Sequence, residues 1–167
     1  MTDFSWHYLA PAVPLVTRFL LAASWHRVMV KNMPEPTNER DLHRSTLLSL
    51  AGFSFTAAAG LAVLDANLKL NLQLPIWYVL VSFVAYMTAL NLQAYKASYL
   101  HDQLSSALME GGNLSLMLAL ITLLIGAGFP EWFQYMAGAL ALGSWLIDHL
   151  IRLAIECLYF RDANNRI

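Results

Sequence analysis

Residues 111–130 read GGNLSLMLALITLLIGAGFP, a stretch without a single Asp, Glu, Lys or Arg. A helix needs about 20 apolar residues to cross the roughly 30 Å of hydrocarbon in a bilayer, and this stretch has that length. Three more charge-free stretches are close to it in length: 45–64, 74–95 and 132–147. The sequence therefore predicts an all-α integral membrane protein with four transmembrane helices in a bundle.

The composition of the chain agrees with this class. Of the 167 residues, 58% are apolar and 13% are charged, whereas a soluble domain carries about 25% charged residues. The length indicates a single membrane domain. A net charge of −1 without a concentrated basic face argues against a nucleic-acid partner. The single cysteine, Cys157, excludes an internal disulfide.

The expected transmembrane helices cover residues 45–64, 76–95, 109–128 and 132–151. In residues 65–75 leucines alternate with polar residues, and we interpret this segment as an extended loop. No Gly-Pro break follows Trp132 before Phe160. We therefore expect the last helix to continue past the membrane as a cytoplasmic extension and tail over 152–167.

Residues 14–31 predict an amphipathic helix that lies in the membrane interface. Its polar residues are spaced mostly three, four or seven apart: Thr17, Arg18, Ser24, Arg27 and Lys31. The alternative is a fifth span. It would place Arg18 inside the bilayer, at a free-energy cost of roughly 2.5–3.5 kcal/mol. We favour the interfacial helix because nothing nearby in the sequence pairs with Arg18. The proline-rich, charged segment 32–44 predicts a solvated cytoplasmic loop.

The basic residues predict the orientation of the chain. With both termini in the cytoplasm, all of the ten Lys and Arg residues except Lys69 lie on the cytoplasmic side. A short chain without transit or cleavable signal features fits a bacterial inner membrane. A crossing N-terminal helix would move only the first dozen residues to the other side, so the charge count does not exclude five spans.

Small residues form two stripes at helical spacing. Gly52, Thr56 and Gly60 recur every four residues in the first span, and Ala139 and Gly143 form a shorter stripe in the last one. Such residues let helix backbones approach closely in a membrane, so we expect packing seams. The alternative is a surface on which a lipid or another ligand slides against bare backbone.

Polar groups within the second and third spans are the candidates for ion chemistry. Thr88, Asn91 and Tyr95 lie three and four residues apart, and they either join helices or line a hydrated vestibule in an oligomer. Glu110 precedes Gly111 and Gly112, which weaken a helix. An acid at such a break marks an ion site in some transporters. We favour a solvated, ionised Glu110 at the cytoplasmic interface, where its charge suits the start of a helix.

The beginning of the C-terminal extension carries an interfacial charge cluster. Asp148, Arg152 and Glu156 alternate in sign at i,i+4 spacing, which predicts a solvated helix face that also carries His149. No paired-histidine metal motif, nucleotide-binding loop or hydrolase motif occurs in the sequence. We therefore expect no catalytic residues, no metal and no cofactor.

These observations favour a non-enzymatic integral membrane subunit or scaffold of an oligomeric inner-membrane assembly. Its expected partners are the lipid bilayer and either further copies of the chain or other membrane subunits. One alternative is a homo-oligomeric ion channel or pore-forming membrane effector. Another is an enzyme that acts on a lipid at the cytoplasmic interface through Glu110, His149 or Asp148.

Overall fold

The computed structural model describes residues 6–24, 37–68, 71–94 and 99–165, which are almost entirely helical. Its elements are a 3-10 helix η1 and five α-helices: η1 Trp6–Ala12, α1 Val13–Ser24, α3 Thr37–Leu68, α4 Gln73–Ala94, α5 Tyr99–Gly126 and α6 Glu131–Asn165. Four of them, α3 to α6, are long and apolar enough to cross a membrane. The multi-pass all-α class predicted from the sequence is confirmed at this level.

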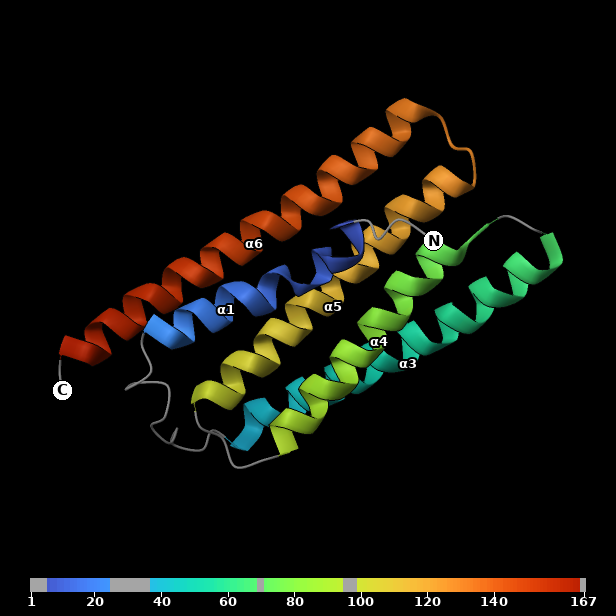
Figure 1. The fold of residues 1–167 in the computed structure, drawn as a ribbon. Coiled ribbons are helices and arrows are strands. Elements are labelled where there is room, and N and C mark those ends of the chain that lie inside the picture. Colours follow the sequence, from blue (N-terminus) through green and yellow to red (C-terminus); the bar gives the residue numbers. More distant parts are fainter. Residues whose placement is uncertain (1–5, 25–36, 69–70, 95–98, 166–167) are drawn as a thin grey trace.

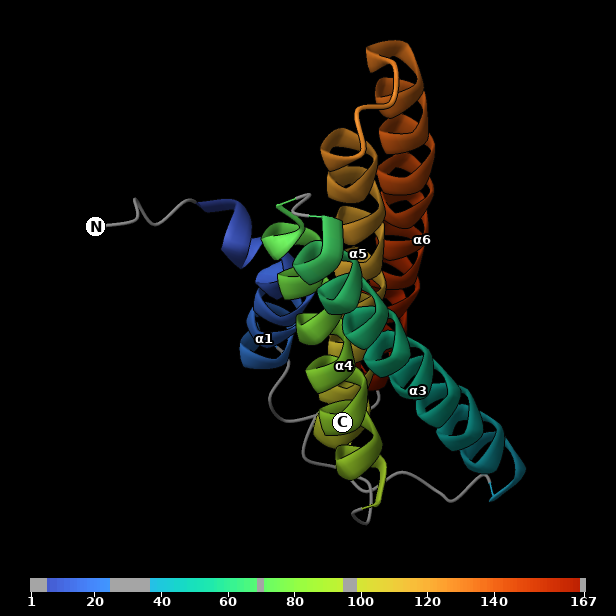
Figure 2. The same ribbon diagram turned by 90° about the vertical axis from the view of Figure 1, so that its right-hand side faces the viewer.

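The long helices form an antiparallel row more than a closed bundle. Helix α3 packs on α4, α4 packs on α5, and α5 also contacts α6 and α1. Helices α3 and α6 lie at opposite edges of the row, and α1 runs lengthwise beside α5 (Figure 1). Towards Thr37, α3 diverges from α4 (Figure 2). The outer faces of α3 and α6 are consequently left without a partner within the described part of the chain.

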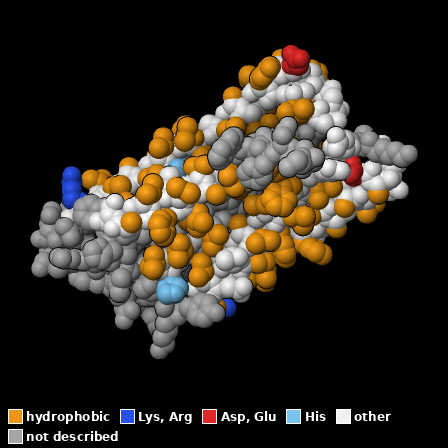
Figure 3. All heavy atoms as spheres, in the orientation of Figure 1, with side chains coloured by type: hydrophobic (Ala, Val, Ile, Leu, Met, Phe, Trp, Pro, Cys, Tyr) orange, Lys and Arg blue, Asp and Glu red, His pale blue; other side chains and the backbone are white. Residues whose placement is uncertain are grey.

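The apolar core lies between α3, α4 and α5. The buried residues of one cluster join α3 and α4, and those of a second cluster, nearer the Leu68 end of α3, join α3, α4 and α5. The first contains Leu47, Ala51, Tyr86 and Ala89, with Leu108 packed against it, and the second contains Ala58, Tyr78, Val79 and Ala119. Large apolar side chains also cover much of the visible outer surface (Figure 3), as expected of a surface that faces lipid.

The helix bounds differ from the predicted spans mainly at the ends that carry polar residues. Residues 37–44 of the predicted loop belong to α3, and α5 begins at Tyr99, well before the predicted start at residue 109. Charged residues continue a helix beyond its apolar part, so the length of the apolar stretch underestimates the helix. The long final helix is confirmed, because α6 runs without interruption from Glu131 to Asn165.

The connection between α3 and α4 is much shorter than the extended loop predicted for residues 65–75. Helix α3 continues to Leu68 and α4 begins at Gln73. Asn71 adopts a left-handed φ of 54°, a conformation that asparagine tolerates better than most residues. The Asp65 carboxylate accepts a hydrogen bond of 2.7 Å from the backbone N–H of Leu72, whose side chain is buried. Leu68 and Leu74 therefore belong to helices, and Leu72 directly precedes α4.

We expect Asp65→Ala to lower the free energy of unfolding by about 1–2 kcal/mol, because it leaves the Leu72 N–H without its charged acceptor. Asp65→Asn keeps an acceptor oxygen and is the matched control, with a smaller loss. Thermal unfolding of the full chain in detergent measures both. Equal losses in the two variants would contradict the role assigned to this hydrogen bond.

Candidate functional site

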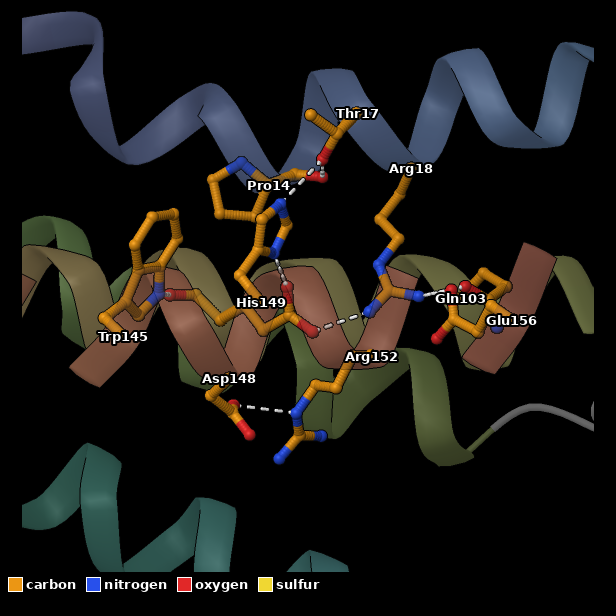
Figure 4. A network of polar contacts seen from close by, with 10 residues as sticks. Pro14, Thr17, Arg18, Gln103, Trp145, Asp148, His149, Arg152 and Glu156 are labelled. Atoms are coloured by element: carbon orange, nitrogen blue, oxygen red, sulfur yellow. Dashed lines mark hydrogen bonds and ion pairs between the residues drawn. The ribbon is translucent and has the colours of Figure 1, made fainter. Parts of the chain in front are cut away.

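Arg18 of α1 is the largest fully buried side chain among the described residues, with 1% of its surface exposed. Its Nη2 donates to Oε1 of Glu110 on α5 at 2.6 Å, and its Nη1 donates to Oε1 of Gln103 at 2.7 Å. Nη1 also pairs with the carboxylate of Glu156 on α6. One guanidinium thus contacts groups on two long helices (Figure 4).

Glu110 is the centre of this arrangement and is itself only 2% exposed. Its second carboxylate oxygen, Oε2, lies 2.6 Å from Nδ1 of His149 on α6. Its backbone carbonyl accepts a long hydrogen bond of 3.3 Å from the indole N–H of Trp145. We call Arg18, Gln103, Glu110, His149 and Glu156 the Arg18 cluster.

His149 is fixed on both ring nitrogens and on one ring face. Its Nε2 lies 3.4 Å from the hydroxyl oxygen of Thr17 on α1, and this hydroxyl donates to the carbonyl of Pro14 at 2.9 Å. The Trp145 ring stacks on the imidazole with centroids 5.0 Å apart and planes 9° from parallel. The imidazole, 4% exposed, therefore joins α1, α5 and α6.

The Arg18 cluster lies far from the ends of the two long helices that build it. At 1.5 Å per residue, Glu110 is about 17 Å from the Tyr99 end of α5 and about 24 Å from its Gly126 end. His149 is about 27 Å from the start of α6 and about 24 Å from its end. Charged groups that are buried inside the protein need partners there, and Arg18, Glu110 and His149 have them.

This geometry overturns the reason for placing residues 14–31 in the membrane interface. Arg18 does have partners, but they come from residues 85 and 92 positions further along the chain. Of the expected interfacial helix, the structure describes α1, a short apolar helix that ends at Ser24 and packs along α5. Arg27 and Lys31 lie outside the described residues.

Glu110 is not solvated, and Gly111 and Gly112 do not interrupt α5. A Cβ atom on Gly111 would lie 2.8 Å from the backbone oxygen of Pro11, and one on Gly112 would lie 2.6 Å from Cε1 of Tyr86. The two glycines therefore let η1 and α4 approach α5 closely. Tyr86 uses this position to donate a hydrogen bond of 2.7 Å to the side-chain oxygen of Asn113.

The predicted C-terminal charge cluster divides between two faces of α6. The i,i+4 pair of Asp148 and Arg152 is confirmed, at 2.8 Å and exposed to solvent. His149 and Glu156 are turned inward to Glu110 and Arg18 instead, so the prediction of one solvated face that carries all four groups is wrong.

The predicted packing stripes lie on outer surfaces. A Cβ atom on Gly52, Gly60 or Gly143 would meet no atom within 4 Å. The Thr56 hydroxyl bonds to the carbonyl of Gly52 in its own helix, and Ala139 is exposed. Within the described part of the chain, these stripes are therefore not used for packing between its own helices.

The polar candidates of the second span do not join Glu110. Thr88 and Asn91 are exposed on α4, and Tyr95 lies outside the described residues. The Thr88 hydroxyl donates to the carbonyl of Val84. Thr88 also lines an apolar groove of about 430 Å³ between the N-terminal helices and α4, together with Leu9, Leu15, Trp77 and Leu80. A shared pathway through Glu110 and Asn91 is not formed within one chain.

The chemistry available to the Arg18 cluster is proton binding. Thr17, His149 and Glu110 align a hydroxyl, an imidazole and a carboxylate, as nucleophilic triads do. However, the hydroxyl proton is directed to Pro14, and the carboxylate is shared with Arg18. The guanidinium between Glu110 and Glu156 also occupies the position that a cation would need, and among the described residues no acidic or histidine cluster suits a metal ion.

Sequence reasoning singled out Arg18, Glu110, His149 and Glu156, but it placed only His149 and Glu156 together and assigned Arg18 and Glu110 to other surroundings. It missed Gln103 and Trp145 as their partners, and it assigned Thr17 to an interfacial polar face. The available signal was that each charged group lies inside or beside an apolar helix, where it requires a partner on another helix. Comparison with known protein families, curated proteins and solved structures finds no match to this chain.

Proposed function

We propose that the protein is a non-enzymatic multi-pass membrane subunit or scaffold that associates with other membrane helices through the outer face of α3. The observation that carries this proposal is the position of Gly52 and Gly60 on a surface where an added Cβ atom meets nothing within 4 Å. Small residues at four-residue spacing favour close helix contacts in a membrane, and the described part of the chain supplies none here.

The packing of α6 supports the same proposal. Only 6% of the most apolar stretch of α6 is buried inside the chain, against 39% for α4. A membrane helix with so little contact within its own chain has a large surface available to other helices. The outer faces of α3 and α6 lie on opposite edges of the row, so one chain presents two surfaces (Figure 1).

The proposed location is an inner membrane, with both termini on the cytoplasmic side. Its support is the charge distribution: the one basic residue assigned to the other side is Lys69, directly after α3. The end of α1, the start of α3 and the end of α6 lie at one end of the row, which is compatible with a cytoplasmic C-terminus, whereas η1 lies away from that end (Figure 1). In the same arrangement α1 is embedded beside α5 rather than lying on the membrane surface.

We expect Gly52→Leu and Gly60→Leu to weaken association at least about tenfold, or about 1.4 kcal/mol. The added side chains separate the two backbones without disturbing contacts inside the chain. Ala62→Leu, at an exposed position of the same helix outside the stripe, is the matched control and keeps wild-type association. The mass of the complex extracted in mild detergent measures the effect. Unchanged association in both glycine variants would refute this use of α3.

A homo-oligomeric channel is the second candidate, favoured by the exposure of Thr88 and Asn91 on a membrane-spanning helix. Polar groups on such a surface are satisfied when several copies place them around a shared axis. Reconstituted protein would then conduct ions through liposomes, and Asn91→Leu would reduce the flux. Tight liposomes at high protein loading would leave the scaffold as the function.

A further inference from the structure

The hydrogen-bond distances around His149 allow its protons to be assigned. The Thr17 hydroxyl has one proton, which we assign to the carbonyl of Pro14 because that distance, 2.9 Å, is shorter than the 3.4 Å to Nε2 of His149. Towards Nε2 of His149, 3.4 Å away, the hydroxyl oxygen therefore acts as an acceptor, which makes Nε2 an N–H donor. On the other side of the ring, Nδ1 faces a carboxylate oxygen of Glu110 at 2.6 Å. An ionised carboxylate only accepts, so Nδ1 carries a proton as well.

The charges of the Arg18 cluster lead independently to the same protonation state. Arg18 contributes one positive charge, and Glu110 and Glu156 contribute two negative charges. With a neutral imidazole the buried cluster has a net charge of −1, which is costly away from water. One additional proton balances it. The other charged groups of α6 near the cluster, Asp148 and Arg152, are exposed and paired with each other.

We propose that the Arg18 cluster is a proton-binding site, with one proton shared between His149 and Glu110, and that this proton fastens α6 to α1 and α5. Bound, the proton lets the imidazole donate to α1 through Nε2 and to α5 through Nδ1. When it leaves, one of these two hydrogen bonds is lost and the cluster keeps an unbalanced charge of −1. Because α6 has so little apolar contact inside the chain, loss of the proton releases it. The ligand is a proton, and the responding element is α6.

The first test is nitrogen NMR of the full chain in lipid nanodiscs, with ring-labelled histidine, titrated over about pH 5–9. His149 is assigned with His149→Gln. At the acidic end we expect the signature of a doubly protonated ring, lost as the pH rises. A singly protonated ring over the whole range, with the Arg18 to Glu110 pair intact, would overturn the proposal.

The variant Glu156→Gln distinguishes a proton-binding role of the Arg18 cluster from a purely structural role. In this variant the charges of Arg18 and Glu110 cancel without an extra proton. We therefore expect the proton affinity of His149 to decrease at least about tenfold, which lowers the midpoint of its NMR titration by one pH unit. Asp148→Asn is the matched control. It removes an exposed acid next to His149 in the sequence and is expected to keep the wild-type midpoint. A wild-type midpoint in Glu156→Gln would overturn the proposal.

The second test follows α6 by hydrogen exchange of residues 145–156. Residues 78–89 of α4, which lie in the apolar core, are measured in the same sample as a reference. Their exchange corrects the α6 rates for the general acceleration of amide exchange by base. We expect α6 to lose protection relative to α4 as the pH rises. In Glu156→Gln this relative protection becomes independent of pH between about 6 and 8. Parallel behaviour of α6 and α4 in the wild type would show that no release occurs.

Discussion

Replacement of Arg18 by methionine is expected to lower the free energy of unfolding by about 3–5 kcal/mol, the usual cost of removing one partner from a buried ion pair. The substitution leaves the buried carboxylate of Glu110 and the partly buried carboxylate of Glu156 without their shared guanidinium. Thermal unfolding of the full chain in detergent, followed by circular dichroism, measures this loss.

Two further variants separate charge from packing in this result. Arg152→Met removes an exposed arginine of the neighbouring ion pair and should cost at most about 1 kcal/mol. The double variant Arg18→Met with Glu110→Gln removes a charge of each sign and should recover a large part of the stability lost by Arg18→Met alone. Equal losses for Arg18→Met and Arg152→Met would contradict the assignment of Arg18 as the ion that joins α1 to α5 and α6.

Gly112→Ala is expected to lower the free energy of unfolding by about 1–3 kcal/mol, because it overpacks the contact between α5 and α4. The added Cβ atom would lie 2.6 Å from Cε1 and 2.8 Å from Cζ of Tyr86. That ring is fully buried and is fixed through its hydroxyl to Asn113. Neither the ring nor the α5 backbone can move aside without losing this hydrogen bond.

Gly143→Ala is the matched control for this prediction, and its expected change in the free energy of unfolding has the opposite sign. Gly143 also lies inside a long helix, but an added Cβ atom there meets nothing within 4 Å. Alanine is the better helix former by about 1 kcal/mol, so this variant should be as stable as the wild type or more stable. A loss of stability in Gly143→Ala comparable to that in Gly112→Ala would show that the steric argument is wrong. The same melting experiment compares the two.

The four long helices could be predicted from the sequence because each has an apolar stretch of nearly membrane length without charges. The ends of α3 and α5 could not, since polar residues at helix ends are equally compatible with a loop. The pair Gly111 and Gly112 shows a similar ambiguity. Glycine is unfavourable in an isolated helix but suitable where another backbone approaches, and only the positions of Pro11 and Tyr86 distinguish the two cases.

The charged residues of the candidate site could be singled out from the sequence, but their contacts with one another could not be predicted. Helical periodicity relates residues three or four positions apart, as it did for Asp148 and Arg152. Arg18 and Glu110 are 92 positions apart, and His149 and Glu110 are 39 apart, so no local pattern connects them. Their association depends on how helices pack in the row, which follows from contacts such as that of Tyr86 with Gly112.

The long sequence separation between Arg18 and Glu110 also constrains how the chain is built in the cell. At 5–20 residues per second, Glu110 leaves the ribosome roughly 5–20 s after Arg18, and Glu156 follows later still. Throughout that interval Arg18 lacks the two carboxylates with which it pairs in the folded chain, which disfavours entry of α1 into hydrocarbon. We therefore expect α1 to take its place beside α5 only after α5 and α6 have been made.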